Sequence, residues 1–262
     1  MRLAAFLLFG SMLYGQQIYD LLLKNGRVID PANHRDARFD VAVIGNRIVK
    51  VAPDLPAAHS HVVVEVSGYM ITPGLIDINA RFGSSLKPDY NTLPYGVTTA
   101  VDVGNCEIAE RSKVRLLPDA ECKNHSVASP GFVFRKSSPD AISSGMDSKN
   151  VLIPRANMAT AMSIFLNLGM TPEQIIERVT SNPARAIKQP ELGNLSEGSV
   201  ADIAVLEIQQ GKFGFLDSAL TRLDGTRRFR CLLTVRNGVI VWDSDGLSIP
   251  DTLKAGPYTN FK

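Results

Sequence analysis

Two neighbouring histidines have a spacing that could bind a metal ion. His59-Ser60-His61 would place both imidazoles on one face of an extended strand, where they can bind zinc or nickel. The pair follows a proline-alanine run, and a polar turn before a strand at 62–66 explains these residues better. We therefore expect no functional metal site here, although adventitious metal binding at His59 and His61 stays open.

Two other residue pairs match the spacing of functional motifs but lack the rest of each motif. Cys122 and His125 have ligand-like spacing, with Cys106 upstream, but a structural zinc site needs four ligands and no fourth lies nearby. Ser84 and Lys87 match the S-x-x-K pattern of penicillin-recognising enzymes, but the accompanying SDN and KTG elements are missing. We interpret both pairs as chance.

The run TPGLIDINAR at 72–81 is the most informative stretch. Its apolar residues from Leu75 to Ile78 predict a short buried strand. Asn79 and Arg81 follow it. A guanidinium has five donors, no available lone pair and a permanent positive charge, so Arg81 cannot ligate a cation. The Asn79 carbonyl is a poor replacement for an imidazole.

Strands are predicted at both ends of the chain. Turn-forming dipeptides separate short apolar runs in each section, and they predict hairpins: Asn25-Gly26, Gly45-Asn46 and Asn237-Gly238. Further strands are predicted at 201–207 and 230–235. Two strand-rich sections at opposite ends indicate one small β-domain assembled from both.

The centre of the chain has a different pattern. A buried strand is predicted at 96–103, and a helix from Met158 ends at Gly169. Thr171 begins a second helix with a capping box, and that helix is expected to end near Asn182-Pro183. The methionines of these helices are expected to pack in the core. Residues 104–138 show no clean period and indicate a loop or insert.

Composition excludes some partners. The 262 residues are 45% hydrophobic, and 28 basic against 26 acidic residues leave a net charge of +2. Such a balance gives no electrostatic reason to expect nucleic acid as a partner. The only dense basic cluster, formed by Arg227, Arg228 and Arg230, is interpreted as a solvated strand edge.

The first residues resemble a secretory signal. Arg2 precedes an apolar stretch at 3–14, and Gly15 is a small cleavage residue, so 1–15 predicts a signal peptide and export to the periplasm or outside the cell. No other segment is expected to span a membrane. In an oxidising compartment Cys106 and Cys122 could pair, with Cys231 left in an apolar strand, and three free thiols are the alternative.

Six segments together resemble the amidohydrolase superfamily, in particular cyclic amidohydrolases of the dihydroorotase and deacetylase-like type. They are DLLLKNGRVID, TPGLIDINAR, YGVTTAVDVG, SPDAISSGMDS, LGMTPEQIIERVTSNPARAI and EGSVADIAVLE. The resemblance implies a (β/α)8 TIM-type barrel with a metal centre at the C-terminal ends of its strands, plus a small β-sandwich made from both chain ends. The family uses a divalent metal such as zinc, which activates water to attack an amide or cyclic amide.

The resemblance also implies which positions should hold the metal. The family's His-x-His on the first strand corresponds to Asn79 and Arg81, and its strand-eight aspartate corresponds to Gly145. Asp140 and Asp147 are the weak candidates for a substitute carboxylate. A shift of two or more residues, however, moves a carboxylate several Å along a strand.

The central ligands of the family, a lysine and two histidines, should lie between the GVTTAVDVG and SPDAISS segments, where this chain is shorter than a full barrel requires. The segment 73–190 is less than half of the ~250 residues of a full barrel. We therefore expect a truncated barrel at 73–190 and a composite β-sandwich at 16–72 and 191–262.

The functional hypothesis is a C–N hydrolase by family that is catalytically impaired, with no intact metal site and no cofactor expected. Its partner, if any, is a small-molecule amide, and a homo-oligomer is one way to cover the open sheet edges. The alternatives are a non-catalytic ligand- or protein-binding remnant of the fold, and a residual enzyme that uses Asp140, Asp147 or the histidine pair in a rebuilt site.

Overall fold

The computed structural model describes residues 18–82, 86–103, 112–118, 127–128, 139–146, 157–216 and 221–249. The predicted signal peptide at 1–15 and the side chains of Cys106 and Cys122 lie outside this part of the chain. Cys231 lies in a strand, as predicted, and burial raises the pKa of its thiol to about 12. In the described part, no helix is both long and apolar enough to cross a membrane.

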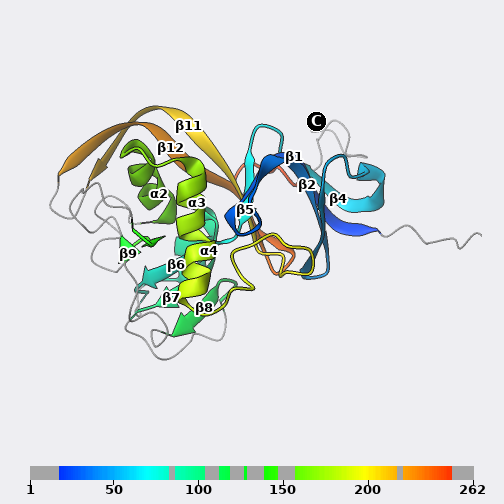
Figure 1. Ribbon diagram of the computed structural model, residues 1–262, viewed down its shortest axis with the longest axis horizontal. Helices are drawn as coiled ribbons and strands as arrows, with labels where there is room; N and C mark the ends of the chain where they lie inside the picture. The colour runs from blue at the N-terminus through cyan, green and yellow to red at the C-terminus, as the bar shows by residue number, and fades with distance from the viewer. Residues whose placement is uncertain are drawn as a thin grey trace, which may run out of the picture.

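One eight-stranded sheet contains strands from both ends of the described chain (Figure 1). Its order is β13-β12-β11-β5-β1-β2-β3, with β4 paired to β1. The bounds are β1 (Tyr19–Asp30), β2 (Arg35–Ile44), β3 (Arg47–Ala52), β4 (Ser60–Glu65), β5 (Met70–Pro73), β11 (Ile203–Leu216), β12 (Arg222–Arg236) and β13 (Val239–Asp243). Strand β5 joins the two ends, because it pairs with β1 on one side and β11 on the other.

The predicted turns at Gly45-Asn46 and Asn237-Gly238 are confirmed, since they connect β2 to β3 and β12 to β13. The predicted hairpin at Asn25-Gly26 is wrong, because β1 runs straight through these residues. Asn25 adopts φ +66, and the β1–β2 register shifts between Leu23 and Gly26. The dipeptide therefore makes a β-bulge, which the Asp40 carboxylate holds by accepting from Asn25 N at 2.7 Å.

A second group of strands is parallel. The three-stranded sheet has the order β6-β7-β8, and a separate pair joins β9 to β10. The bounds are β6 (Leu75–Ala80), β7 (Val97–Asp102), β8 (Arg115–Pro118), β9 (Val127–Ala128) and β10 (Ala141–Ile142). The described residues thus form a mixed α/β structure in which these parallel strands do not close into a barrel.

Two short segments precede β7, and three helices are described between β10 and β11. They are α1 (Pro88–Thr92), the 3-10 turn η3 (Leu93–Tyr95), α2 (Met158–Asn167), α3 (Pro172–Val179) and α4 (Ser181–Ala186). The capping box of Thr171 and Gln174 is confirmed at the start of α3. The predicted end at Asn182-Pro183 is wrong, because both residues lie in the first turn of α4. Proline is tolerated there, since the first N–H groups of a helix have no intrahelical partner.

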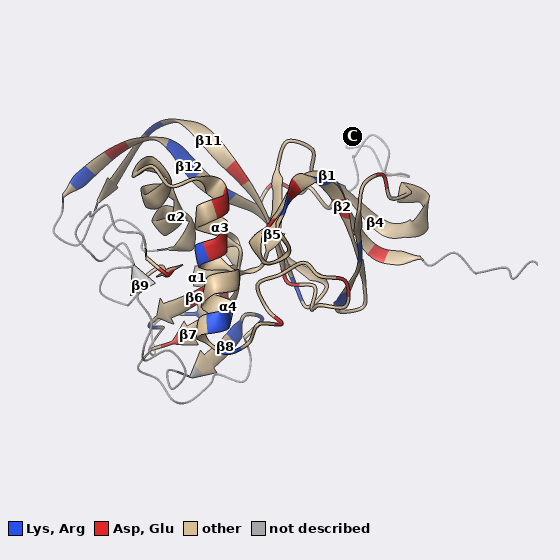
Figure 2. Ribbon diagram, in the orientation of Figure 1, with Lys and Arg blue, Asp and Glu red and all other residues tan. Residues whose placement is uncertain are grey.

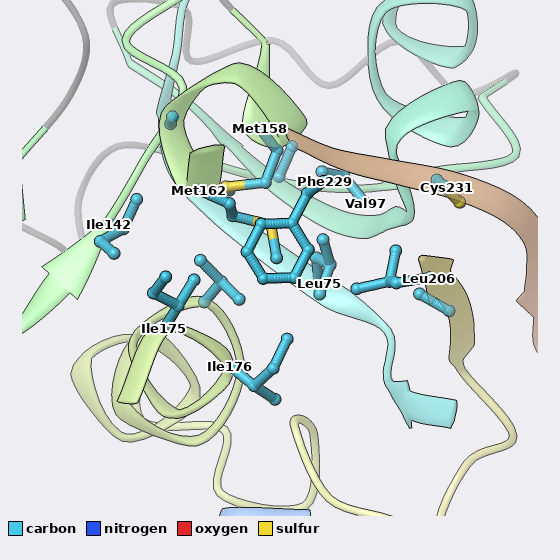
Figure 3. Close-up of a cluster of buried hydrophobic side chains, with 14 of the residues drawn as sticks. Leu75, Val97, Ile142, Met158, Met162, Ile175, Ile176, Leu206, Phe229 and Cys231 are labelled. Atoms are coloured by element: carbon cyan, nitrogen blue, oxygen red, sulfur yellow. The ribbon is translucent and has the colours of Figure 1, made fainter. Parts of the chain in front are cut away.

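The helices pack on the parallel strands through a shared apolar core. Figure 3 shows Phe229 of β12 surrounded by Met158 and Met162 of α2, Leu75 of β6 and Ile176 of α3. Phe229, Met158 and Met162 are each no more than 2% exposed, so the core role predicted for these methionines is confirmed. Burying a side chain of this size contributes about 1.5–3 kcal/mol.

Helix α2 also covers one edge of the ribbon formed by β11 and β12, which arches over it (Figure 1). Asn167 accepts from Thr226 N at 3.0 Å and donates to Arg227 O at 2.7 Å, and Ser163 Oγ accepts from Phe229 N at 2.9 Å. Two polar side chains one helical turn apart thus replace a neighbouring strand. An unpaired strand edge would otherwise leave these backbone groups without partners.

Removing the Asn167 carboxamide should loosen this ribbon. We expect Asn167→Ala to lower the free energy of unfolding by about 1–3 kcal/mol, because Thr226 N and Arg227 O lose their partner. Urea denaturation measures the loss, and hydrogen exchange should be faster at the Thr226 and Arg227 amides. Asn91→Ala is the control, because Asn91 makes an exposed bond to Lys87 O. Equal midpoints for the two variants would contradict this role.

Candidate functional site

The ends of β6 and of the segment after β10 lie side by side. Arg81 N donates to Met146 O at 2.8 Å, and Ser143 Oγ donates to Asn79 O at 3.2 Å. Gly145 lies between these two contacts, at φ +58, a left-handed conformation that glycine adopts without strain. The structure therefore brings Asn79, Arg81 and Gly145, the three positions singled out from the resemblance, to one place.

A buried carboxylate holds the two segments together. Asp77 of β6 is 1% exposed, and it accepts hydrogen bonds from the hydroxyls of Ser143 and Ser144. The backbone N–H groups of Ser144 and Asn79 also donate to it, both at 3.2 Å. Four donors on two oxygens offset the cost of burying this group. Asp77 is thus committed to positioning the strand end.

The three positions singled out from the resemblance do not fit a divalent cation. Arg81 has no lone pair to donate, and Gly145 has no side chain, which leaves the Asn79 carbonyl as the only side-chain ligand of the three. The Arg81 side chain is exposed, and no described residue forms an ion pair with its guanidinium. Nor does the described part of the chain contain a group of three His, Cys, Asp or Glu residues that could hold a metal.

One further carboxylate lies close by. Asp102 ends β7, faces Ala80 in the strand register, and accepts from Phe82 N at 3.1 Å. It is absent from the residues predicted from sequence. The sequence feature that could have identified Asp102 is its position as the last polar residue of the GVTTAVDVG strand. The carboxyl ends of parallel strands meet at one edge of a sheet, so a polar residue there is a candidate for the site.

The remaining predicted residues that the structure describes lie elsewhere. Asp140 is exposed and precedes β10, at the opposite end of the strand from Gly145, and its carbonyl accepts from Asn182. His59 ends a 3-10 turn (Ala57–His59), and His61 is exposed in β4, which belongs to the eight-stranded sheet and not to the sheet of β6. Lys87 stacks on Tyr90. Asp147, Ser84, Cys106, Cys122 and His125 lie outside the described residues.

Comparisons with known proteins identify the family that part of this sequence resembles. Residues 152–242 match the family model described as Amidohydrolase family. Dihydroorotases of Streptococcus pyogenes serotype M3 and Streptococcus thermophilus are 39% and 38% identical over 93 residues, which cover 32% of this chain. The match covers 22% of each relative, so the chain spans less than a quarter of the length of these relatives.

Solved structures extend the similarity to most of the fold. A crystal structure of an adenine deaminase has a TM-score of 0.72 and 16% identity, covering 86% of this chain and 100% of that chain. A dihydroorotase has a TM-score of 0.69 and 16% identity, covering 86% and 99%. The resemblance to cyclic amidohydrolases of the amidohydrolase superfamily is therefore confirmed, in sequence over 152–242 and in fold over most of the chain.

The role of Asp77 can be tested by mutation. We expect Asp77→Ala to lower the free energy of unfolding by about 3 kcal/mol, because two buried hydroxyls lose their acceptor. Chemical denaturation gives the value. Asp140→Ala is the matched control, since it removes an exposed carboxylate from the segment that Asp77 binds, and its expected effect is within about 0.5 kcal/mol. Similar losses in both variants would show that Asp77 does not hold the segments together.

Proposed function

We propose that this chain is an amidohydrolase-fold protein related to metal-dependent C–N hydrolases, and that it has lost metal-dependent hydrolysis. The observation that carries the proposal is Arg81 beside Gly145 at the ends of β6 and the 143–146 segment. The resemblance assigns metal-ligand positions to both residues, but Arg81 carries a permanent positive charge and Gly145 has no side chain.

The chemistry explains why this loss matters. In such hydrolases a bound metal lowers the pKa of water and polarises the carbonyl, and both effects require ligands with lone pairs. We assign Asp77 a positioning role instead, because its carboxylate accepts four hydrogen bonds, three on Oδ1 and one on Oδ2. These bonds commit it to joining β6 to the 143–146 segment.

The short barrel segment supports the same proposal. A βαβ unit needs about 30 residues and a full barrel about 250. The three parallel strands β6, β7 and β8 and the β9–β10 pair are the strands described between 73 and 190. We infer that the barrel is truncated and that part of the pocket that chooses a substrate is missing with it.

The proposal predicts turnover no faster than the uncatalysed reaction. Purified protein, supplied with zinc or manganese, should hydrolyse neither dihydroorotate, nor hydantoins, nor N-acetyl amino acids. Product formation followed by chromatography measures this directly. Metal-dependent turnover above a blank without enzyme would overturn the proposal.

Restoring the ligand types should restore metal binding. We expect the triple variant Asn79→His, Arg81→His, Gly145→Asp to bind zinc about tenfold or more tighter than the parent. Asp is among the residues that tolerate the left-handed conformation of Gly145. Competition against a chromogenic chelator gives the affinity.

The matched control for this variant is Asn79→Gln, Arg81→Gln, Gly145→Asn, which removes the charge without supplying imidazoles. An equal gain in the control, or no gain in the histidine variant, would show that these positions do not form the metal site of the fold.

A further inference from the structure

A groove separate from the Asp77 site lies between the β11–β12 ribbon and the elements packed against it. It has a volume of about 760 Å³ and is called here the ribbon groove. Its walls come from β11, β12, β13, η3 and the start of α2, and they share no residue with the cluster around Asp77. The volume is within the range of small-molecule sites, about 300–1,000 Å³.

Aromatic side chains form much of the groove wall. Tyr95, Phe213, Phe215, Phe229 and Trp242 all line it. Trp242 keeps 37% of its surface exposed, whereas Phe215 and Phe229 are buried. Accessible aromatic surface of this kind favours a ligand with a planar ring, through stacking and edge contacts.

The charges lining the groove have one sign. Lys212, Arg228 and Arg230 line it, and no Asp or Glu is among its described lining residues. These cations belong to the basic positions that follow the ribbon (Figure 2). Arg230 is already engaged, because it binds Asp245 and Glu207, and the hydrogen bond with Asp245 raises the pKa of its guanidinium.

The other two cations have no carboxylate partner among the described residues. Arg228 donates to Gln209 Oε1 at 2.7 Å and lies 4.6 Å from the centroid of the Phe213 ring, so its position is fixed while its charge is not neutralised. Lys212 is exposed and makes no ion pair within the described part of the chain. The groove therefore carries a net positive charge.

The start of α2 adds to this charge. Asn157, Ala159 and Thr160 line the groove, and they are the cap and first turn of a ten-residue helix. The N-terminal end of a helix carries a partial positive charge. A ring-bearing anion placed here would meet two uncompensated cations, a helix N-terminus and aromatic walls.

We propose that the ribbon groove binds a small organic anion that carries an aromatic ring. Charge complementarity selects an anion over a neutral ligand, and the aromatic walls select a ring over an inorganic ion. The proposal goes beyond the loss of hydrolysis, since it needs neither a metal nor turnover.

Trp242 gives a direct readout, because it is the only tryptophan in the sequence. Its fluorescence, excited at the red edge of its absorption, is titrated with 4-phenylbutyrate and with the uncharged 4-phenylbutyramide. We expect saturable quenching by the carboxylate and about tenfold weaker binding of the amide. No saturable quenching below about 10 mM, or equal affinity for both compounds, would overturn the proposal.

Variants separate the groove from non-specific binding. Lys212→Gln alone, which removes an exposed charge and no packing, should weaken 4-phenylbutyrate binding about threefold. Adding Arg228→Gln should bring the loss to about tenfold or more. Arg38→Gln is the control, because Arg38 is an exposed arginine of β2 outside the groove.

Circular dichroism checks that each variant is folded. Unchanged affinity in the folded Lys212→Gln variant, or an equal loss in Arg38→Gln, would show that the groove charges do not bind the anion. Since the readout is independent of hydrolysis, detected turnover would overturn the proposed function and leave the groove assignment in place.

Discussion

The structure around the candidate site depends on one buried carboxylate. Asp77 is 1% exposed, and the hydroxyl donors that offset its burial are Ser143 and Ser144, which lie more than 60 residues later in the sequence. Because an unpaired buried charge costs several kcal/mol, β6 and the 143–146 segment can pack only in the arrangement that makes these bonds. That arrangement fixes where Asn79, Arg81 and Gly145 lie relative to one another.

The fold of this chain is similar to that of solved structures, whereas the side chains at these strand ends do not suit metal binding. These side chains suit an anion or water better than a cation. Fold similarity at 16% identity says nothing about activity, because function depends on the side chains of the site. In this chain, backbone contacts and hydroxyl–carboxylate bonds fix the geometry of the strand ends, while Arg81 and Gly145 supply no side-chain ligand for a cation.

Features set by a few neighbouring residues could be predicted from the sequence. The capping box of Thr171 and Gln174 and the turn at Gly45-Asn46 depend only on local hydrogen bonds and φ values, so both were found. The bulge at Asn25 could not be predicted, because the partner that decides it, Asp40, lies on another strand. Likewise β11 and β12 extend well beyond their apolar cores, since Asn167 of α2 satisfies the ribbon edge.

The candidate site was only partly predictable, for the same physical reason. Asn79 and Arg81 are two residues apart in the sequence, and their unsuitability as ligands follows from their side-chain chemistry. Their contact with the segment around Gly145 required the family resemblance, and the bonds of Asp77 to the two serines have no sequence signature. Asp102 was missed because a single acid at a strand end has no distinctive spacing. The ribbon groove depends on tertiary packing of five separate elements.

Bound metal per chain tests the central claim most directly. Mass spectrometry of tag-free protein, taken from a monodisperse gel-filtration peak, counts the ions that survive purification. The account predicts near-zero zinc, iron and manganese in folded protein, because Arg81 and Gly145 leave no adequate ligand set. About one or two ions per chain would contradict it and would mean that other residues hold a metal centre.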